Sequence, residues 1–353
     1  MHEQFRIEGH HIDFREFNKY PKSILESNSI DEQEKNSFDF IAKWLDDSDS
    51  IPIQTSGSTG PPKTIEIPKE WMRRSAIATA DRLQLRSQMR SLLCIPSQYI
   101  GGMMMIVRSM IVGMELKIVK PKIELKEMGT FDFAAMIPLQ VETLLINNVP
   151  LGNISKLIIG GAPISNHLEQ RLKGLSGEIY SSYGMTETVS HIALRRLNGP
   201  EASSFFSTLE GIYVETGEEN NLMINIPLFD DLRVVTTDIV QLKDKSTFKW
   251  KGRLDNIINS GGLKIHPEEI EHELSESIQF PFFITAEKNE ALGEIVVLVI
   301  ETDEPLKIQS EIGPRLKALG NRRPRKIYYT KQFARTPNGK IIRDMDKTQI
   351  IEV

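Results

Sequence analysis

The sequence predicts an α/β protein with two domains: a large N-terminal domain, residues 1–252, and a smaller α+β domain, residues 253–353. Strand-like and helix-like segments alternate along residues 69–182, which is typical of a mostly parallel sheet covered by helices. Short strand-like segments then dominate residues 188–251 and predict a small β-rich section of the large domain. The chain is also long enough for two domains of about 100–200 residues each.

Each expected element follows from its apolar periodicity. Residues 1–50 are polar, but apolar side chains recur at helical spacing within 32–45, and we expect this helix to dock on the large domain. Further helices are expected over 69–85, 100–112, 140–147, 166–175, 267–277 and 308–319. Strands are expected over 51–54, 64–67, 91–95, 115–119, 131–137, 156–159, 178–182, 191–194, 211–214, 222–226, 248–250, 282–286 and 295–300.

Composition limits the possible partners of the chain. A net charge of -5, with 40% hydrophobic and 26% charged residues, is ordinary for a globular protein and gives no reason to expect nucleic acid or an anionic membrane as a partner. The N-terminus lacks a secretory pattern, and no apolar run approaches about 18 residues, so we expect a cytoplasmic enzyme. The single cysteine, Cys94, lies in an apolar run and is expected to be buried and inert. A homodimer is compatible with the sequence.

A loop rich in hydroxyls and glycines lies between the strands expected at 51–54 and 64–67. It contains Thr55, Ser56, Gly57, Ser58, Thr59, Gly60 and, after two prolines, Lys63. Glycines let backbone amides turn inward, the hydroxyls add donors and the lysine adds a positive charge, which together suit polyphosphate. The pattern is not that of a Walker loop, because a proline precedes the lysine and a strand follows. A flexible polar hairpin is the alternative interpretation.

Two segments follow strands of the expected parallel sheet. They are Gly160-Gly161-Ala162 and Tyr183-Gly184-Met185-Thr186-Glu187. Because ligands of such sheets gather at the carboxyl ends of the strands, both segments are expected at one edge. Taken alone, Thr186-Glu187 could equally be a helix start with the threonine as its cap.

Four spaced blocks together carry a specific resemblance. The blocks are Thr55–Lys63, Tyr183–Thr188, Gly252–Ile265 and Arg335–Ile341, the last reading Arg-Thr-Pro-Asn-Gly-Lys-Ile. In this order they resemble the adenylate-forming acyl-CoA synthetases. The resemblance implies that a carboxylate attacks the α-phosphorus of ATP, that pyrophosphate leaves, and that the thiol of coenzyme A then takes the acyl group.

The chemistry of that first step assigns the catalytic residues. Two anions must be joined, so the site has to supply cations, backbone amides and Mg²⁺. By resemblance, Lys63 and its loop hold the phosphates, Glu187 holds Mg²⁺, and Thr186 contacts the α-phosphate. Lys340 is expected to be the catalytic lysine, reaching both the carboxylate and the ribose-side oxygen; a solvated turn lysine is the alternative.

The nucleoside contacts are implied in the same way. Tyr183 is expected to lie against adenine beside Gly160, Gly161 and Ala162, with Gly184 and Met185 completing the ATP site. Asp238 matches the ribose-binding aspartate of the family, and Arg253 adds a second ribose or phosphate contact. Family members often have Thr-Gly-Asp where this chain has Thr-Thr-Asp, so Thr237 is a departure. A packing tyrosine and a turn aspartate are the alternative interpretations.

The resemblance also implies that the C-terminal domain moves between the two half-reactions. Asp255 matches the hinge on which that domain pivots between the two half-reactions, although an ordinary linker aspartate remains an alternative. Gly261, Gly262 and Lys264 are expected to serve the thioester-forming state. The basic stretch 315–331 either meets the phosphates of coenzyme A or is a solvated face.

The acyl substrate is indicated less directly. The phosphate loop begins at residue 55, earlier than in longer members of the family, so the chain is similar to a shortened synthetase. The block from Met185 to Arg196 is most similar to the o-succinylbenzoate–CoA ligases of menaquinone synthesis. Tyr99, Gly102 and Ser190 are expected to line the acyl pocket, with Arg195 either facing the second carboxylate or solvated. The alternatives are another aryl or acyl ligase, a carrier-protein-loading enzyme, and a catalytically silent nucleotide-binding regulator.

Overall fold

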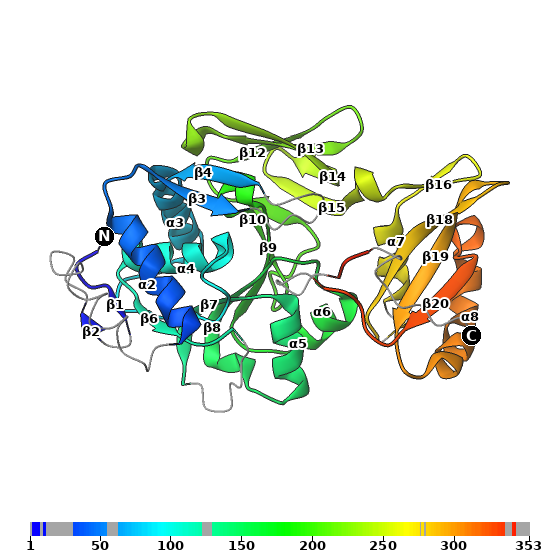
Figure 1. The fold of residues 1–353 in the computed structure, drawn as a ribbon, viewed down its shortest axis with the longest axis horizontal. Coiled ribbons are helices and arrows are strands. Elements are labelled where there is room, and N and C mark those ends of the chain that lie inside the picture. The colour runs from blue at the N-terminus through cyan, green and yellow to red at the C-terminus, as the bar shows by residue number, and fades with distance from the viewer. Residues whose placement is uncertain are drawn as a thin grey trace. The chain divides into compact units, whose positions relative to one another are not determined.

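The structure is a computed structural model that describes residues 2–7, 10–11, 31–54, 63–121, 129–275, 277–278, 280–335 and 341–343 (Figure 1). Its contacts divide the chain into two compact units. Unit 1 comprises Met1–Pro163, Leu172–Tyr213 and Asn225–Val234, and unit 2 comprises Ile164–Arg171, Val214–Ile224 and Val235–Val353. The expected boundary at 252/253 stays a prediction.

Unit 1 is built on a sheet with a parallel centre, as expected for the large domain. The strand order is β11 (Phe206–Thr208), β10 (His191–Arg196), β9 (Glu178–Gly184), β8 (Ile154–Ile159), β7 (Phe131–Met136), β5 (Arg90–Leu93), β6 (Glu115–Ile118), β1 (Arg6–Ile7) and β2 (His10–His11). Strands β9, β8, β7, β5, β6 and β1 run parallel to their neighbours in that series, while β10, β11 and β2 pair antiparallel. The carboxyl ends of β8 and β9 therefore meet at one edge.

The helices of unit 1 include one, α4, that is buried at its centre. They are α2 (Glu32–Leu45), α3 (Lys69–Leu83), α4 (Ile100–Val112) and α5 (Pro138–Ile146). Every residue from 104 to 110 of α4 is buried, because the helix packs on β5, β6 and β7 and is covered by α2 and α3. Helices that are apolar on all sides belong in such a core position. The expected docking of the helix at 32–45 is confirmed, since the Gln33 side chain bonds to the Ile95 carbonyl at 2.8 Å.

A separate hairpin carries the hydroxyl-rich loop. It consists of β3 (Ser50–Gln54) and β4 (Thr64–Pro68), paired antiparallel as far as Gln54 and Thr64. This pairing brings the two ends of residues 55–63 together, as the two flanking strands predict. Three short 3₁₀ helices, η1 (Leu151–Asn153), η2 (Thr186–Thr188) and η3 (Pro227–Phe229), complete the unit.

The β-rich section is a meander of four strands. They are β12 (Tyr213–Thr216), β13 (Asn221–Ile226), β14 (Leu232–Asp244) and β15 (Thr247–Arg253), adjacent in that order. Helix α6 (Asn166–Leu172) is three residues shorter than the sequence predicts. By contacts, most of the meander and of α6 belongs to unit 2.

The remainder of unit 2 is a mixed sheet with two helices. Strand β19 (Gly293–Glu301) pairs antiparallel with β18 (Phe282–Asn289) and β16 (Ile258–Ser260) and parallel with β20 (Lys326–Thr330); β17 (Leu263–Ile265) pairs with β16. The helices are α7 (Pro267–Leu274) and α8 (Pro305–Ala318), with 3₁₀ turns η4 (Leu254–Asn256) and η5 (Gly320–Arg322). Ile270, Leu274 and Leu298 lie in the core between them, which confirms an α+β pattern here.

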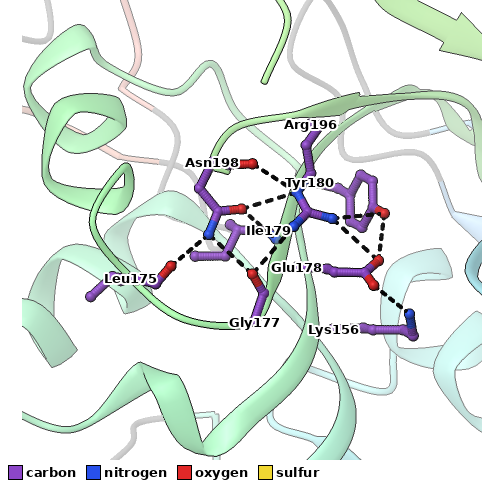
Figure 2. Close-up of polar contacts among 8 residues, drawn as sticks. All are labelled: Lys156, Leu175, Gly177, Glu178, Ile179, Tyr180, Arg196 and Asn198. Carbon is purple, nitrogen blue, oxygen red and sulfur yellow. Dashed lines mark hydrogen bonds and ion pairs between the residues drawn. The ribbon is translucent and has the colours of Figure 1, made fainter. Parts of the chain in front are cut away.

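A polar cluster holds the amino end of β9 in unit 1 (Figure 2). The Asn198 side chain is 1% exposed; its Oδ1 accepts from the Ile179 amide at 3.1 Å, and its Nδ2 donates to the carbonyls of Leu175 and Gly177 at 2.9 and 3.1 Å. The Arg196 guanidinium donates to the same Oδ1 at 3.1 Å. This one amide therefore satisfies backbone groups on both sides of the turn that leads into the strand.

Asn198→Ala is predicted to lower the free energy of unfolding by about 2–4 kcal/mol, because the Ile179 amide and the Leu175 carbonyl lose this partner and the Gly177 carbonyl keeps only the longer bond from Arg196. Chemical denaturation followed by tryptophan fluorescence measures the change. Glu201→Ala, at an exposed turn of the same unit, is the matched control and should stay near zero. Equal effects of the two substitutions would contradict the role assigned to Asn198.

Among the described residues, no helix combines the length and the apolarity needed to cross a bilayer.

Candidate active site

The glycine segment after β8 is shaped by its neighbour on β9. The two strands pair at Ile159 and Ser181, which brings Gly160 beside Ser182. A Cβ on Gly160 would lie 2.2 Å from the Ser182 Oγ, which donates a hydrogen bond to the Ile159 carbonyl at 3.3 Å. Gly161 has a φ of +84°, a conformation that favours glycine. Glycine is therefore required at Gly160 because Ser182 approaches closely, and the expected contact of this segment with a base stays a prediction.

The segment after β9 forms a compact turn that carries Thr186 and Glu187. Residues Thr186–Thr188 make the 3₁₀ turn η2, and the Met185 amide donates to the Thr188 Oγ1 at 3.0 Å. A Cβ on Gly184 would lie 2.3 Å from the Ser190 carbonyl oxygen, so glycine is required for this close approach. The interpretation of Thr186 as a helix cap is wrong, because no α-helix starts here.

Val189 completes this turn in a strained conformation. Its φ is +67° and its ψ is −43°, and the Ser190 amide donates to the Thr188 carbonyl at 2.7 Å, which defines a classic γ-turn. Such a backbone is rare for a β-branched residue. The Val189 side chain is fully buried, so packing stabilises the strained backbone and fixes the direction in which Ser190 leaves the turn.

Glu187 fits the expected role as a ligand of Mg²⁺. Its side chain is exposed at the edge, and within the described residues it makes no ion pair. A carboxylate oxygen is a hard donor of the kind that Mg²⁺ prefers, usually with several waters and phosphate oxygens as the other ligands. Thr186, half-buried, precedes it in the same turn.

Tyr183 has an aromatic neighbour that the sequence did not reveal. Its ring packs edge-on against Phe206 of β11, with centroids 6.0 Å apart. The Arg195 guanidinium lies over the same Phe206 ring at 5.7 Å and donates to the Ser203 carbonyl at 3.2 Å. The expected contacts of Tyr183 with adenine and of Arg195 with an acyl carboxylate stay predictions.

The residues expected at the acyl pocket belong to α4 and to the turn after η2. Tyr99 is the N-cap of α4, and a Cβ on Gly102 would lie 2.3 Å from the Pro96 carbonyl oxygen, so this glycine lets the first turn of the helix pack closely. Ser190 is half-buried, and its Oγ accepts a hydrogen bond from Arg108 of α4 at 2.6 Å.

Arg108 is a functional candidate that the sequence analysis missed. The residue is 3% exposed, its Nε has no hydrogen-bond partner, and among the described residues no carboxylate pairs with it. Burial lowers the pKa of Arg108 to about 9, so the group is still a cation at neutral pH. A buried charge without a counterion is costly. One signal was present in the sequence: a single cation within the apolar run of 103–112.

In unit 2, strand pairing brings two expected nucleotide-binding residues together. Asp238 of β14 lies directly opposite Arg253 of β15, as a joint role at the ribose requires. The Trp250 Nε1 donates to the Asp238 Oδ1 at 3.1 Å, which orients the carboxylate. Their contacts with ribose stay predictions.

The residue that departs from the family pattern contacts the expected hinge. The Thr237 Oγ1 donates to the Asp255 Oδ2 at 2.8 Å and accepts from the Arg253 Nη2 at 2.7 Å. Arg253 also pairs with Asp255 at 2.8 Å. The Arg253 hydrogen bond and then that of Thr237 lower the pKa of the Asp255 carboxyl. A glycine at position 237 would provide neither of the two contacts made by the Thr237 hydroxyl.

The glycine pair expected to serve thioester formation makes a tight turn. Gly261 and Gly262 connect β16 to β17 with φ values of +57° and +84°, the arrangement of a type I′ hairpin. Lys264 follows on β17 and is exposed. In the basic stretch, Arg322 pairs with Glu273 at 2.9 Å and Lys326 pairs with Glu287, so both of these cations are already neutralised by carboxylates.

Two parts of the expected machinery lie outside the described residues. Thr55, Ser56, Gly57, Ser58, Thr59 and Gly60 of the phosphate loop are among them, whereas Lys63 at its end is described. Lys340 also falls outside. On either side of it, Arg335 and Ile341 form an antiparallel β-bridge.

Comparisons with known proteins agree with the resemblance carried by the four blocks. Residues 10–209 match the AMP-binding enzyme family. An acyl-CoA synthetase (AMP-forming)/AMP-acid ligase II-like protein from Dyadobacter fermentans is 35% identical, with 92% of this chain and 96% of that chain covered and a TM-score of 0.61.

Two further relatives are named for the acid that they activate. A 2-succinylbenzoate–CoA ligase from Listeria monocytogenes is 26% identical over 321 residues, which cover 83% of this chain and 68% of that protein. The o-succinylbenzoate CoA synthetase of Bacillus subtilis, solved with its acyl-adenylate, is 19% identical with a TM-score of 0.70, covering 86% of this chain and 70% of that one. The latter shows a common fold. On the match of more than half its length, the chain belongs to the AMP-binding enzyme family.

Proposed function

We propose that the protein is an ATP-dependent acid–thiol ligase that converts o-succinylbenzoate into its coenzyme A thioester by way of an acyl-adenylate and pyrophosphate. The observation that carries the choice of acid is the buried guanidinium of Arg108, which contacts Ser190 at 2.6 Å. Membership of the family supports the reaction type. The 2-succinylbenzoate–CoA ligases among the relatives support the same acid.

The residues after β9 and the phosphate loop have separate tasks in the first step. Lys63 and the hydroxyl-rich loop hold the β- and γ-phosphates and the departing pyrophosphate, while Thr186 donates to the α-phosphate. Glu187 would hold Mg²⁺, which would supply positive charge beside the phosphates. Asp238 accepts from the ribose hydroxyls, its orientation set by Trp250. Lys340 supplies a positive charge to the carboxylate and the α-phosphate as their oxygens approach.

Arg108 explains why the acid should carry a second carboxylate. The substrate has an aromatic ring and two carboxylates, only one of which is activated. The unactivated carboxylate requires a cation in an otherwise apolar wall, and α4 provides an apolar wall with one buried cation. When the substrate binds, the guanidinium gains the counterion that the described part of the chain does not provide, so its desolvation is offset.

The rival functions make different predictions. A ligase for a monocarboxylic aryl or fatty acid has no use for a buried cation beside Ser190, so Arg108 counts against it. A silent nucleotide-binding regulator would release no pyrophosphate with any acid. Measuring pyrophosphate release and thioester formation with o-succinylbenzoate, benzoate and a fatty acid separates the three possibilities, because only the proposed function requires the first acid to react best.

Arg108→Leu is predicted to raise the KM for o-succinylbenzoate by about 10²–10³, since removing one partner of a buried charge pair costs about 2–5 kcal/mol. Stability should be unchanged or higher, because an uncompensated buried cation disappears. Steady-state pyrophosphate release measures the KM. An analogue whose unactivated carboxylate is an amide serves as the control substrate and should respond little. Equal losses with both acids would contradict the assignment.

Gly184→Ala is predicted to slow adenylation by about 10², because the new Cβ meets the Ser190 backbone and displaces the turn that carries Thr186 and Glu187. Gly174→Ala is the matched control, since a Cβ there meets nothing within 4 Å. Pyrophosphate release with saturating ATP measures the rate. Adenylation at the wild-type rate in Gly184→Ala would show that this turn does not hold the reacting groups.

Lys340→Ala is predicted to lower adenylation by about 10²–10³, as for other donors to a developing charge. Thioester formation from pre-made acyl-adenylate should survive, because that half-reaction no longer joins two anions. Stopped assays of each half-reaction measure the two effects, with Lys245→Ala, at an exposed turn, as control. Comparable damage to both half-reactions would count against the role of Lys340.

A further inference from the structure

Arg108 is held on one side by a histidine as well as by Ser190. Its Nη2 lies 2.6 Å from the Ser190 Oγ and 3.4 Å from the His191 Nδ1. His191 is buried, at the start of β10. Since Nη2 carries two hydrogens, one can be directed at each acceptor. The orientation of the guanidinium therefore depends on an acceptor at the Nδ1 position.

The other ring nitrogen of His191 contacts a threonine of α3. The His191 Nε2 lies 3.2 Å from the Oγ1 of Thr79, a residue with no exposed surface. The same Oγ1 donates to the Ser75 carbonyl one turn earlier, at 3.0 Å. With its hydrogen directed at Ser75, the hydroxyl can only accept from the ring. This arrangement places the imidazole proton on Nε2 and leaves the Nδ1 lone pair directed at Arg108.

The imidazole is also kept neutral by its surroundings. Burial and then the charge of Arg108 lower the pKa of His191 well below its usual value. A protonated ring would present a second donor to the guanidinium, and so would the tautomer with the proton on Nδ1. Only one protonation state of the ring fits the contacts of Thr79 and Arg108 together.

We propose that Thr79 and His191 are positioning residues that determine the specificity of the enzyme for a dicarboxylic acid. Neither touches the substrate; they hold the Arg108 guanidinium so that its remaining nitrogens face the second carboxylate. The chain of contacts runs from the Ser75 carbonyl through Thr79 and His191 to Arg108. This inference rests on the proposed function, because it assumes that a carboxylate binds Arg108.

Thr79→Val tests the chain of contacts with little change of volume. The valine lacks an acceptor, so the Nε2 tautomer loses its support and the guanidinium loses its fixed acceptor. We expect the KM for o-succinylbenzoate to rise about tenfold to a hundredfold with kcat nearly unchanged, as for a misplaced hydrogen bond to a charged group. For the amide analogue, which makes no ion pair, KM should change less than about twofold. Thr79→Ser retains the hydroxyl and should restore the wild-type KM.

Nitrogen-15 NMR of the His191 ring provides a readout that does not depend on activity. The wild-type protein should show a neutral ring protonated at Nε2, and Thr79→Val should shift the population towards the Nδ1 tautomer. A wild-type ring protonated at Nδ1, or an unchanged tautomer in Thr79→Val, would overturn the inference. So would equal KM changes for the two acids. Inactivity of the wild-type protein towards both acids would instead overturn the proposed function, while the NMR result still decides the tautomer.

Discussion

The antiparallel pairing of β9 with β10 brings together Thr186 and Glu187, proposed for the nucleotide, and Ser190, proposed for the acid. Its close backbone approach at Gly184 leaves 2.3 Å between a would-be Cβ and the Ser190 carbonyl, so the chain must reverse within a few residues. Thr186 and Glu187, the proposed contacts of phosphate and Mg²⁺, lie in this turn, and the Ser190 side chain accepts a hydrogen bond from Arg108. One backbone feature thus positions both the residues proposed for the nucleotide and the residue proposed for the acid, and a shift of the turn would move both.

The second constraint is electrostatic. A buried guanidinium in α4 is destabilising without a counterion. A substrate with a second carboxylate supplies that counterion, which offsets part of the desolvation penalty on binding. An acid without the second carboxylate offsets none of this penalty. This asymmetry discriminates more strongly than a fit of apolar surfaces, where a missing methylene changes binding by only about 1–3 kcal/mol. Specificity of this kind depends on the position of a charge more than on the shape of the pocket.

Much of the fold could be predicted because the local patterns agree with the tertiary structure. The apolar run at residues 100–112 predicts α4 with both of its ends. The alternation of hydrophobic strands with helices predicts the positions of the strands of unit 1. The two glycine-containing segments reach one edge because parallel strands require it. The resemblance to adenylate-forming enzymes is confirmed by the family match.

What could not be predicted depends on contacts between distant elements. Arg108 is a candidate only because α4 is covered by other elements. Its acceptors, Ser190 and His191, come from the turn after η2 and from the start of β10, which the sequence does not show to be neighbours of α4. The contact between Thr237 and Asp255 depends on the register of β14 with β15. From the sequence, Arg195 either faces the acyl carboxylate or is solvated; its position over the Phe206 ring follows from the pairing of β10 with β11.

The γ-turn at Val189 has an evolutionary consequence. A backbone of this kind stores about 1–3 kcal/mol, held in place by the burial of the valine side chain. A glycine would relax the backbone, yet it would also release the packing that directs Ser190 and, through it, Arg108. Because the loss of a buried valine side chain costs at least as much as the strain that glycine would relieve, selection for stability and selection for the position of Ser190 both retain a side chain here.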